Sequence, residues 1–265
     1  MSDLAQTARQ ASDHPALETA ARVGYAISGV LHLLIGWIAL QVAWAGGGGQ
    51  KADQGGALQT LAGNGVGQAL LWVGVLGFLG LGLWQLADGA VGHPGSGTDA
   101  WGRRVKAFAK AAVYLVLAWT TFGFARGKQS DSKEQTVDFT ATLMEQPGGR
   151  WLVALVGLTV IGVGAYHVHK GATKRFLRDL EEHPGQWATK AGVVGYVAKG
   201  AALAVVGILF VTAALHGNAK EASGLDGALR TLKEQPFGPA LLTAVAAGLV
   251  AYGLYSFSRS RHARV

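Results

Sequence analysis

Two lysines and a serine interrupt long apolar stretches of the sequence, where polar side chains are costly. Ser28, Lys110 and Lys199 occupy matching places, each about two helical turns from one end of its stretch. A lysine within a membrane span costs about 3 kcal/mol and usually has a function. Parallel repeats are related by an axis along the membrane normal, so matching residues can surround that axis. Two ammonium groups and a hydroxyl arranged in this way would bind an anion, such as a phosphate, a carboxylate or a lipid head group. The alternative is that both lysines extend their stems to the lipid head groups.

Three histidines form a second set that could do chemistry. Each precedes a proline in a polar segment ahead of an apolar one, at His14, His93 and His183. Three imidazoles on one membrane face could hold a zinc ion or respond to pH. The alternative is a linker, because a proline pre-organises the first turn of a helix. We expect the linker, and therefore no metal site.

His32 is a separate case, about three turns into the first apolar stretch. Two other stretches hold Tyr114 and Leu203 at the matching place. A metal or haem ligand needs further ligands and oriented partners around it. We therefore expect His32 to be a hydrogen-bonded packing residue.

The sequence lacks the usual groups of an enzyme. It has no cysteines, which excludes thiolate catalysis and thiolate metal sites. No paired carboxylates lie within the apolar stretches, so proton relays lack their usual groups. The glycine run Gly46–Gly49 is not followed by the Lys-Ser/Thr of a phosphate-binding loop. We expect a protein that is not an enzyme and needs no cofactor.

The composition that surrounds these residues is that of a membrane protein. Half of the 265 residues are apolar and 15% are charged, whereas soluble domains carry about 25% charged residues. Six apolar stretches are each close to the roughly 20 residues that a helix needs to cross a bilayer. Because a backbone in lipid must satisfy its own hydrogen bonds, these stretches are predicted to be helices. They are Val23–Trp44, Gly67–Ala87, Val105–Phe124, Trp151–Val168, Ala191–Leu215 and Pro239–Phe257.

The sequence repeats itself three times. Offsets of 82 and 89 residues align the odd-numbered spans with one another, and likewise the even-numbered spans. Such repetition indicates repeated structural units. The predicted divisions are a tail at residues 1–21 and repeats at 22–92, 93–182 and 183–265, the last with a short basic C-terminal tail. The predicted fold is an all-α membrane protein with six transmembrane helices in three pseudo-equivalent hairpins.

Small residues recur at matched places in every repeat. Because seven residues make about two helical turns, their spacing gives each odd-numbered span one small-residue face. Small side chains let membrane helices approach closely, so we expect helix packing along these faces. The matched residues are Gly29, Ala111 and Gly200, then Gly36, Ala118 and Gly207 seven residues later, and in the even-numbered spans Gly82, Gly164 and Gly253.

A seven-residue motif, Leu-x-Glu-Gln-Pro-x-Gly, occurs twice between spans. It contains Glu145-Gln146-Pro147 and Glu234-Gln235-Pro236. Proline has no amide hydrogen and disfavours helix in the residue before it. The motif is therefore predicted to end a short surface helix on the outer side and to redirect the chain into the next span. Its glutamates could also bind cations weakly, but helix termination explains them more simply.

The distribution of lysine and arginine predicts the orientation. The two tails and the even-numbered connections hold 13 of the 23 basic residues when Lys106, at the start of the third stretch, is counted with them, and the odd-numbered connections hold 8. Basic residues collect on the cytoplasmic side of membrane proteins. Both termini are therefore predicted to be cytoplasmic. No basic cluster of the kind that binds nucleic acid is present.

The chain resembles the bacterial membrane family called domain of unknown function 1206. The resemblance rests on "ARVGYAISG" and "VVGYVAKG", on "TLMEQPGGRWL" and "TLKEQPFGPALL", and on "YGLY" at Tyr252–Tyr255. It covers residues from about 20 to 258. The middle repeat departs, with Ala107 where the others have Tyr25 and Tyr196. The resemblance implies three two-span repeats in a bacterial plasma membrane and no established activity.

Three functional hypotheses follow. The first is binding or passage of a small anionic solute or lipid by the Ser28, Lys110 and Lys199 set, as in a transporter or channel. The second is a non-catalytic accessory or scaffold subunit of a membrane complex, which docks a membrane-protein partner through its small-residue faces. The third is a membrane enzyme, which ranks last because acid-base and metal groups are missing.

Overall fold

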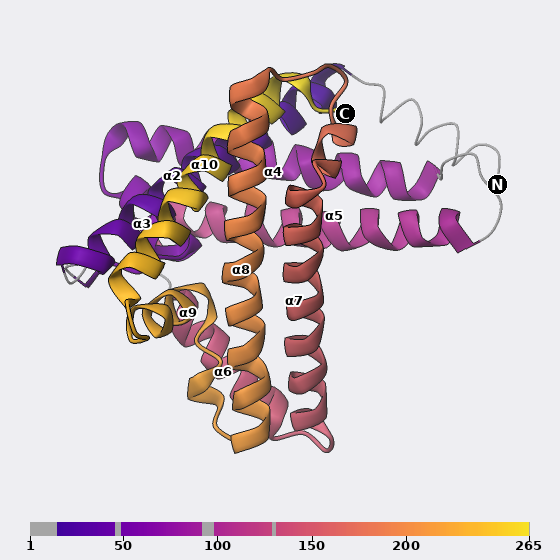
Figure 1. The fold of residues 1–265 in the computed structure, drawn as a ribbon. Coiled ribbons are helices and arrows are strands. Elements are labelled where there is room, and N and C mark those ends of the chain that lie inside the picture. The colour runs from indigo at the N-terminus through magenta and orange to yellow at the C-terminus, as the bar shows by residue number, and fades with distance from the viewer. Residues whose placement is uncertain (1–14, 46–48, 92–97, 129–130, 265) are drawn as a thin grey trace. The chain divides into compact units, whose positions relative to one another are not determined.

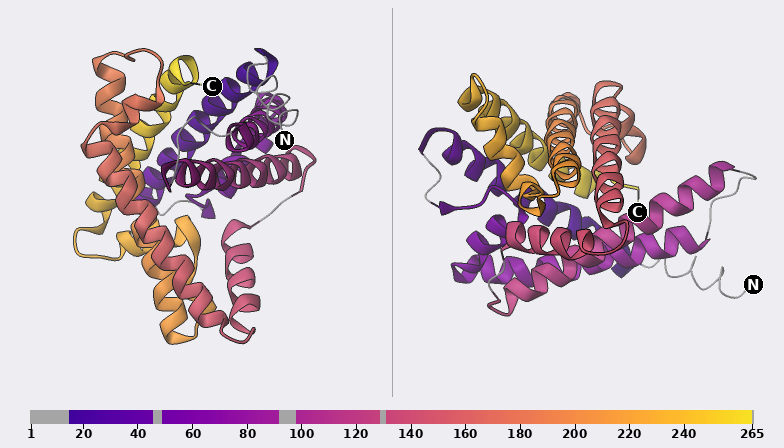
Figure 2. Two further views of the ribbon diagram at one scale, coloured as in Figure 1. Left: turned by 90° about the vertical axis from the view of Figure 1, so that its right-hand side faces the viewer. Right: turned by 90° about the horizontal axis from the view of Figure 1, so that it is seen from below.

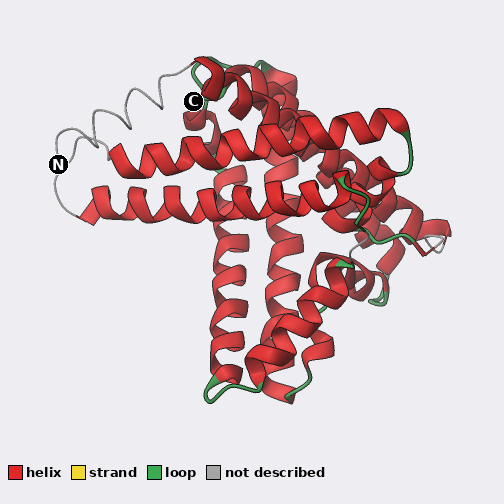
Figure 3. Cartoon of the chain, turned by 180° about the vertical axis from the view of Figure 1, so that it is seen from behind, coloured by secondary structure: helices red, strands yellow, loops and turns green. Residues whose placement is uncertain are grey.

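Six long helices dominate the fold, which is all-α. The computed structural model describes residues 15–45, 49–91, 98–128 and 131–264, and no strand occurs among them (Figure 3). All six helices are long and apolar enough to cross a membrane, which confirms the six predicted spans. They are α2 (Pro15–Ala45), α4 (Gly65–Val91), α5 (Thr98–Ala125), α7 (Gly149–Ala172), α8 (Gln186–His216) and α10 (Gly238–His262) (Figure 1).

A short helix precedes the second long helix of each repeat, as the sequence predicts. These helices are α3 (Gln54–Ala62), α6 (Ser132–Met144) and α9 (Gly224–Lys233). Two short 3-10 helices, η2 (Arg175–Asp179) and η3 (Ala219–Glu221), complete the described elements. Each repeat therefore has a long helix, a surface helix and a returning long helix.

Two compact units divide the chain, and they do not follow the repeats. Unit 1 is Met1–Ser28, Thr60–Gln129 and Ser256–Val265, and unit 2 is Gly29–Gln59 and Ser130–Tyr255. The helices of the middle repeat therefore fall in different units, α5 in unit 1 and α7 in unit 2.

In unit 2, α7 and α8 lie side by side as an antiparallel pair (Figures 1 and 2). A Cβ atom at Gly164 would lie 2.7 Å from the carbonyl oxygen of Gly200, and one at Gly157 would lie 2.8 Å from that of Gly207. Backbone meets backbone at both places, so no side chain fits there. The predicted small-residue face of the third repeat is thus a helix-packing surface.

The same pairing recurs between α10 and α2 in unit 2. A Cβ atom at Gly253 would lie 2.8 Å from the carbonyl oxygen of Gly29, and one at Gly36 would lie 2.8 Å from that of Ala246. These four residues are the repeat equivalents of the four at the α7/α8 pair. The second long helix of one repeat therefore packs on the first long helix of another.

In unit 1, α4 and α5 form the third pair of this kind (Figure 3). Here a Cβ atom at Gly82 would lie 2.7 Å from Cδ2 of Leu115. The Gln68 side chain donates a hydrogen bond to the carbonyl of Ala125. At the equivalent place in the α7/α8 pair, Arg150 Nε donates to the carbonyl of Ala214 at 3.1 Å. The equivalent polar side chain thus connects the helix ends in both pairs, and Arg150 also donates from Nη2 to the carbonyl of Leu215 at 3.0 Å.

Helices of the same repeat also pack through glycine in the first and third repeats. A Cβ atom at Gly24 would lie 2.5 Å from the carbonyl oxygen of Gly77, which joins α2 to α4 in unit 1. In unit 2, a Cβ atom at Gly195 would lie 2.5 Å from Cα of Tyr252, and one at Gly248 would lie 2.1 Å from Cβ of Ala198. These contacts join α8 to α10.

The middle repeat has no glycines at the corresponding positions. The offsets place Lys106 where Gly24 and Gly195 stand, and Thr159 where Gly77 and Gly248 stand. Both side chains are exposed, Lys106 on α5 in unit 1 and Thr159 on α7 in unit 2. The close backbone packing of the outer repeats is therefore not encoded in the middle one.

The repeated Glu-Gln-Pro motif ends a surface helix, as predicted. Glu145 and Glu234 are the C-cap residues of α6 and α9. After the proline, Gly148 takes a left-handed φ of 75° and Phe237 takes one of 60°. The next glycine starts the membrane helix, and its amide donates to the motif's glutamine carbonyl at 2.8 Å in both copies.

The last glycine of the motif is required by close approach to the surface helix. A Cβ atom at Gly149 would lie 1.8 Å from the carbonyl oxygen of Leu143, and one at Gly238 would lie 1.7 Å from that of Lys233. Gly67 occupies the same place in the first repeat, 2.0 Å from the carbonyl oxygen of Leu61. The close approach is therefore common to all three repeats, but the turn is not, because α4 already starts at Gly65, two residues earlier.

Candidate functional site

Lys199 lies near the middle of α8, in unit 2. The helix begins at Gln186 and ends at His216, so Lys199 is about 20 Å from its start at 1.5 Å per residue. Trp187 and Lys190, both exposed, form a cation-π pair near that start, with Nζ 5.6 Å from the ring centroid. Such aromatic and basic residues are typical of the membrane interface. Lys199 lies more than two turns beyond them.

The ammonium group of Lys199 contacts two side chains from other helices. Its Nζ donates a hydrogen bond to Nε2 of His32, on α2, at 3.2 Å. It also lies 4.2 Å from the ring centroid of Tyr252, on α10. The rings of His32 and Tyr252 are 4.7 Å apart. The three residues therefore form one cluster, which we call the Lys199 cluster.

The hydrogen bond between Lys199 and His32 is the polar contact of the cluster. A protonated lysine can only donate, and Nε2 of His32 accepts in the tautomer that carries its proton on Nδ1. His32 thus forms a hydrogen bond and a ring contact with other helices, which agrees with its predicted packing role. The sequence reasoning did not connect it with Lys199.

Glycines on the neighbouring turns position the cluster. Gly195 lies one turn before Lys199 and lets the backbone of α10 approach at Tyr252. Gly253 follows that tyrosine and lets α2 approach at Gly29 and Leu33. Close helix approach of this kind is the usual role of glycine in membrane proteins. The side chains of the Lys199 cluster therefore meet because glycines let α10 approach both α8 and α2 closely.

Lys170 shows how the same fold holds a lysine that is purely structural. Its side chain, near the end of α7, is buried and forms a salt bridge with Asp179 of η2. It also lies 5.3 Å from the ring centroid of Tyr196. A carboxylate thus balances the charge of Lys170. No carboxylate pairs with Lys199 among the described residues, where its partners are an imidazole and a phenol ring.

Ser28 and Lys110, the other two members of the predicted anion set, lie in unit 1. Ser28 is half-buried on α2, and Lys110 is half-buried on α5. Lys199 is half-buried on α8 in unit 2. Each lies 12 or 13 residues after the first residue of its helix, deeper than the predicted two turns, because the helices begin before the apolar stretches. A common site formed by the three stays a prediction.

The predicted histidine set falls mostly outside the described residues, which exclude His14 and His93. His183 is exposed, and its Nδ1 accepts a hydrogen bond from the amide of Gly185 at 3.1 Å. Gly185 is the N-cap of α8, so this histidine stands in the turn that starts the helix. No group of three metal-binding side chains occurs in the part of the chain that the structure describes.

The six motif residues, Glu145, Gln146, Pro147, Glu234, Gln235 and Pro236, are all exposed. More highly organised carboxylates lie nearby in unit 2. Asp226 is buried, accepts from the amide of Ala52 at 2.9 Å and pairs with Arg230 at 2.8 Å. The Arg230 side chain also donates to the carbonyl of Gln50 at 2.9 Å. This network attaches α9 to the segment before α3.

Asp53 is the buried carboxylate beside this network. Its Oδ1 accepts a hydrogen bond from the amide of Gly56 at 2.8 Å, at the start of α3. Burial raises the pKa of the Asp53 carboxyl above its usual range, and the negative charge of Asp226 adds to that rise. The Gly56 amide and Lys51 act in the opposite direction. The network thus connects α9 with the start of α3, and burial favours the protonated form of its Asp53 carboxyl.

Sequence reasoning found Lys199 but missed His32 and Tyr252 as its partners. His32 stands one helical turn after Ser28 and so shares a helix face with a predicted site residue. That spacing was the one available signal. For Tyr252 the sequence held no such signal, because the equivalent residues Val163 and Leu81 are apolar.

Comparisons with known proteins agree with the repeat pattern. The model of a family described as Domain of Unknown Function (DUF1206) matches residues 23–92, 105–174 and 194–263. The chain is also similar to an uncharacterized protein, YxxB of Bacillus subtilis (strain 168), with 30% identity over 252 residues, 92% of this chain and 90% of that protein. No solved structure matches. The three matched segments start at the offsets found within the sequence.

Proposed function

The chain belongs to the family described as Domain of Unknown Function (DUF1206), and from that premise we propose that this multi-pass membrane protein binds an anionic group at Lys199. The group is a carboxylate or phosphate carried by a small solute or a lipid. Binding rather than catalysis is the proposed role, and a bound anion is the proposed partner.

One observation carries the proposal: the ammonium of Lys199 has no carboxylate partner among the described residues. A charge within the apolar part of a membrane protein is costly unless it is paired. His32 and Tyr252 supply a hydrogen-bond partner and an aromatic face. Neither cancels the charge, and a half-buried ammonium keeps a donor for a further group. An anion from outside the chain would supply the missing compensation.

The alternative of lipid-directed lysine stems fits Lys199 less well. A lysine that reaches the head groups does so from near a helix end. Lys199 lies near the middle of α8, and its ammonium contacts two side chains from other helices. The geometry supports an interior position for this lysine.

The test is native mass spectrometry of the protein gently extracted from its own membrane. Wild type is compared with Lys199→Met, which keeps an unbranched stem without the charge. Lys190→Met is the matched control, because this exposed lysine lies on the same helix. We expect an anionic species bound to wild type and to the control, and lost from Lys199→Met. The mass of that species tells a lipid from a solute.

Other outcomes would count against the proposal. An adduct that survives Lys199→Met places the ligand elsewhere, and no adduct in any sample removes the basis for an anion site. A co-purifying protein that survives Lys199→Met favours an accessory or scaffold subunit instead. That alternative would rest on the apolar outer face of α7, where Trp151 is 80% exposed and Leu155 is 60% exposed.

We also place the protein in a bacterial plasma membrane with both termini on the cytoplasmic side. The excess of lysine and arginine in the tails and even-numbered connections supports this orientation. The chain has no cysteine, so single substitutions report position cleanly. On intact cells, a membrane-impermeant maleimide should label Lys220→Cys and leave Glu182→Cys unlabelled until the cells are opened. The reverse pattern would invert the topology.

A further inference from the structure

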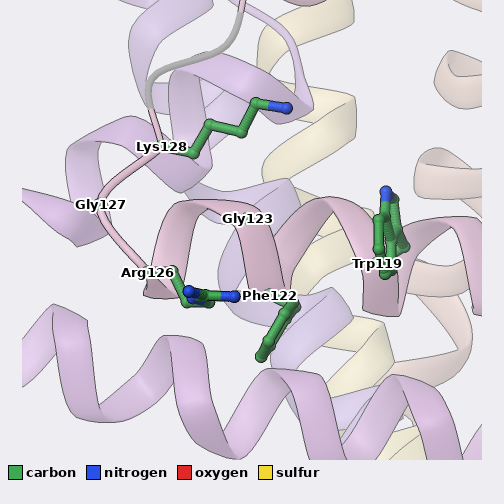
Figure 4. Close-up of a pocket in the computed structure, with 6 residues that line it drawn as sticks. All are labelled: Trp119, Phe122, Gly123, Arg126, Gly127 and Lys128. Atoms are coloured by element: carbon green, nitrogen blue, oxygen red, sulfur yellow. The ribbon is translucent and has the colours of Figure 1, made fainter.

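The end of α5 in unit 1 carries a hollow that is separate from the Lys199 cluster. It has a volume of about 370 Å³, within the range of ligand-binding clefts. Its lining comes from the last two turns of the helix and the turn that follows (Figure 4). The lining residues are Trp119, Phe122, Gly123, Arg126, Gly127 and Lys128.

The apolar part of the hollow is a group of aromatic rings. The centroid of Phe122 lies 6.3 Å from that of Trp119 and 5.8 Å from that of Trp72, on the neighbouring α4. Trp119 is 76% exposed. Exposed tryptophan at the end of a membrane helix is typical of the lipid interface, where its ring lies at the level of the head groups. An acyl chain or glycerol backbone would therefore find apolar surface here.

Two cations flank this aromatic group. The guanidinium carbon of Arg126 lies 5.5 Å from the centroid of Phe122. Figure 4 shows the Arg126 side chain pointing toward Phe122, while Lys128 folds back above Gly123. Both side chains are exposed, and neither pairs with a carboxylate among the described residues. Arginine binds phosphate through two parallel hydrogen bonds, and lysine adds a point charge.

These cations are not needed to finish the helix. The amide of Lys128 donates to the carbonyl of Gly123 at 2.9 Å, and the amide of Gly127 donates to that of Phe124 at 2.9 Å. This pair of bonds, with Gly127 at a φ of 79°, is a Schellman ending. Gln68 occupies the carbonyl of Ala125. The last carbonyls of α5 are thus satisfied without either charged side chain.

In the sequence, this pair of cations occurs at the end of the first long helix of the middle repeat and has no counterpart at the matched positions of the other two repeats. The offsets place Trp44 and Leu215 at the positions equivalent to Arg126. A general interface belt would be expected in all three repeats, since the helices are equivalent. The charge pair therefore points to a ligand with a negative group that meets only α5.

We propose that the end of α5 binds an anionic phospholipid, with the phosphate between Arg126 and Lys128 and the apolar part against Trp119 and Phe122. Gly123 forms the floor of the hollow, because a Cβ atom there would meet only Lys128 carbons, at 3.8 Å or more. A larger side chain at this position would fill the space. The proposed ligand is a lipid and not a free phosphate, because a free phosphate would leave the aromatic surface of Trp119 and Phe122 uncovered.

The test compares thermal unfolding of the full chain in nanodiscs of phosphatidylcholine with and without phosphatidylglycerol. We expect phosphatidylglycerol to raise the Tm of wild type. The double variant Arg126→Gln/Lys128→Gln should lose most of this shift, because losing the charged hydrogen bonds to the phosphate weakens lipid binding about ten-fold. Gly123→Leu should lower the shift without removing either charge.

Two controls keep the result specific. Arg104→Gln/Lys106→Gln removes two exposed cations from the opposite end of α5 and should keep the full shift. Lys199→Met separates the two proposals: a shift that is lost in Lys199→Met but kept in Arg126→Gln/Lys128→Gln assigns the lipid to the Lys199 cluster and overturns the site at the end of α5. The proposal is overturned if Arg126→Gln/Lys128→Gln and Gly123→Leu both keep the full shift. It is also overturned if the opposite-end variant loses as much, or if inorganic phosphate alone gives the same shift.

Discussion

The α7/α8 pair and the α4/α5 pair are the same interface built in two ways. In the α7/α8 pair, a Cβ atom at Gly164 would meet the backbone of Gly200 at 2.7 Å. In the α4/α5 pair, a Cβ atom at the equivalent Gly82 would meet the end of the Leu115 side chain, also at 2.7 Å. The distances match, but a backbone cannot move aside and a leucine side chain can. The α7/α8 pair is therefore held by backbone contact, whereas in the α4/α5 pair the Leu115 side chain packs against Gly82.

The difference follows from residue size at matched positions. The α7/α8 pair has Gly157, Gly200 and Gly207, where the α4/α5 pair has Val75, Ala111 and Ala118. Added methyl groups separate the helix axes, and side chains then fill the gap. Repeats of one ancestral pattern thus differ in how much change each interface tolerates.

The largest effect is expected from alanine at the two equivalent glycines. Gly164→Ala places a methyl group against the Gly200 carbonyl and should lower the free energy of unfolding by about 1–3 kcal/mol, as for other overpacked sites. Gly82→Ala should cost less than about 1 kcal/mol, because Leu115 can rotate and alanine favours helix. Unfolding of both variants in detergent, followed by circular dichroism, measures the difference.

Gly162→Ala is the control for that comparison. It lies on α7 with open space around its Cβ position, so only helix propensity changes. Its stability should equal or exceed that of wild type. Equal losses in Gly164→Ala and Gly82→Ala would show that the two interfaces do not differ as described.

A second equivalent pair tests the turns that lead into α7 and α10. Gly148 and Phe237 share a left-handed conformation after the motif proline, with φ of 75° and 60°. Such a conformation costs a residue other than glycine about 1 kcal/mol. We expect Gly148→Ala to lower stability and Phe237→Gly to raise it, each by about that amount. Melting temperatures of the two variants should therefore move in opposite directions, and movement in one direction contradicts the turn geometry.

The smallest effect is expected at Asp53, which belongs to unit 2 and has no counterpart in the α4/α5 pair. Burial raises the pKa of the Asp53 carboxyl above its ordinary pKa of 3.8, which applies in the unfolded chain. The folded state therefore holds the carboxyl proton more tightly than the unfolded chain does. Stability from this group is therefore present at low pH and falls as pH rises through the raised value. Asp53→Asn keeps an oxygen for the Gly56 amide and cannot ionise.

Hydrogen exchange of peptides from α3 measures this response. As pH rises, the α3 amides of wild type should exchange faster by more than the intrinsic pH dependence of amide exchange accounts for. The α3 amides of Asp53→Asn should show the intrinsic increase alone. Asp138→Asn, at an exposed carboxylate on α6, is the control and should behave as wild type does. An Asp53→Asn variant that follows wild type across the range would remove the assigned cause.

Local structure was predictable because its causes are local. Apolar length located the six spans, and the motif prolines located the ends of α6 and α9. The matched glycines gave the packing faces, since small residues at helical spacing have few other roles. These features depend on residues within a few turns of one another.

Tertiary structure alone decided which helices meet. The pairing of α10 with α2 joins residues more than 200 positions apart, such as Gly253 and Gly29. The Lys199 cluster arises in the same way, because Lys199, His32 and Tyr252 come from three helices and two repeats. The repeat equivalents of His32 and Tyr252 differ from them in type, so symmetry did not reveal the grouping. The sequence determined where a lysine enters the apolar region, and the crossing of glycine-rich backbones decided what that lysine contacts.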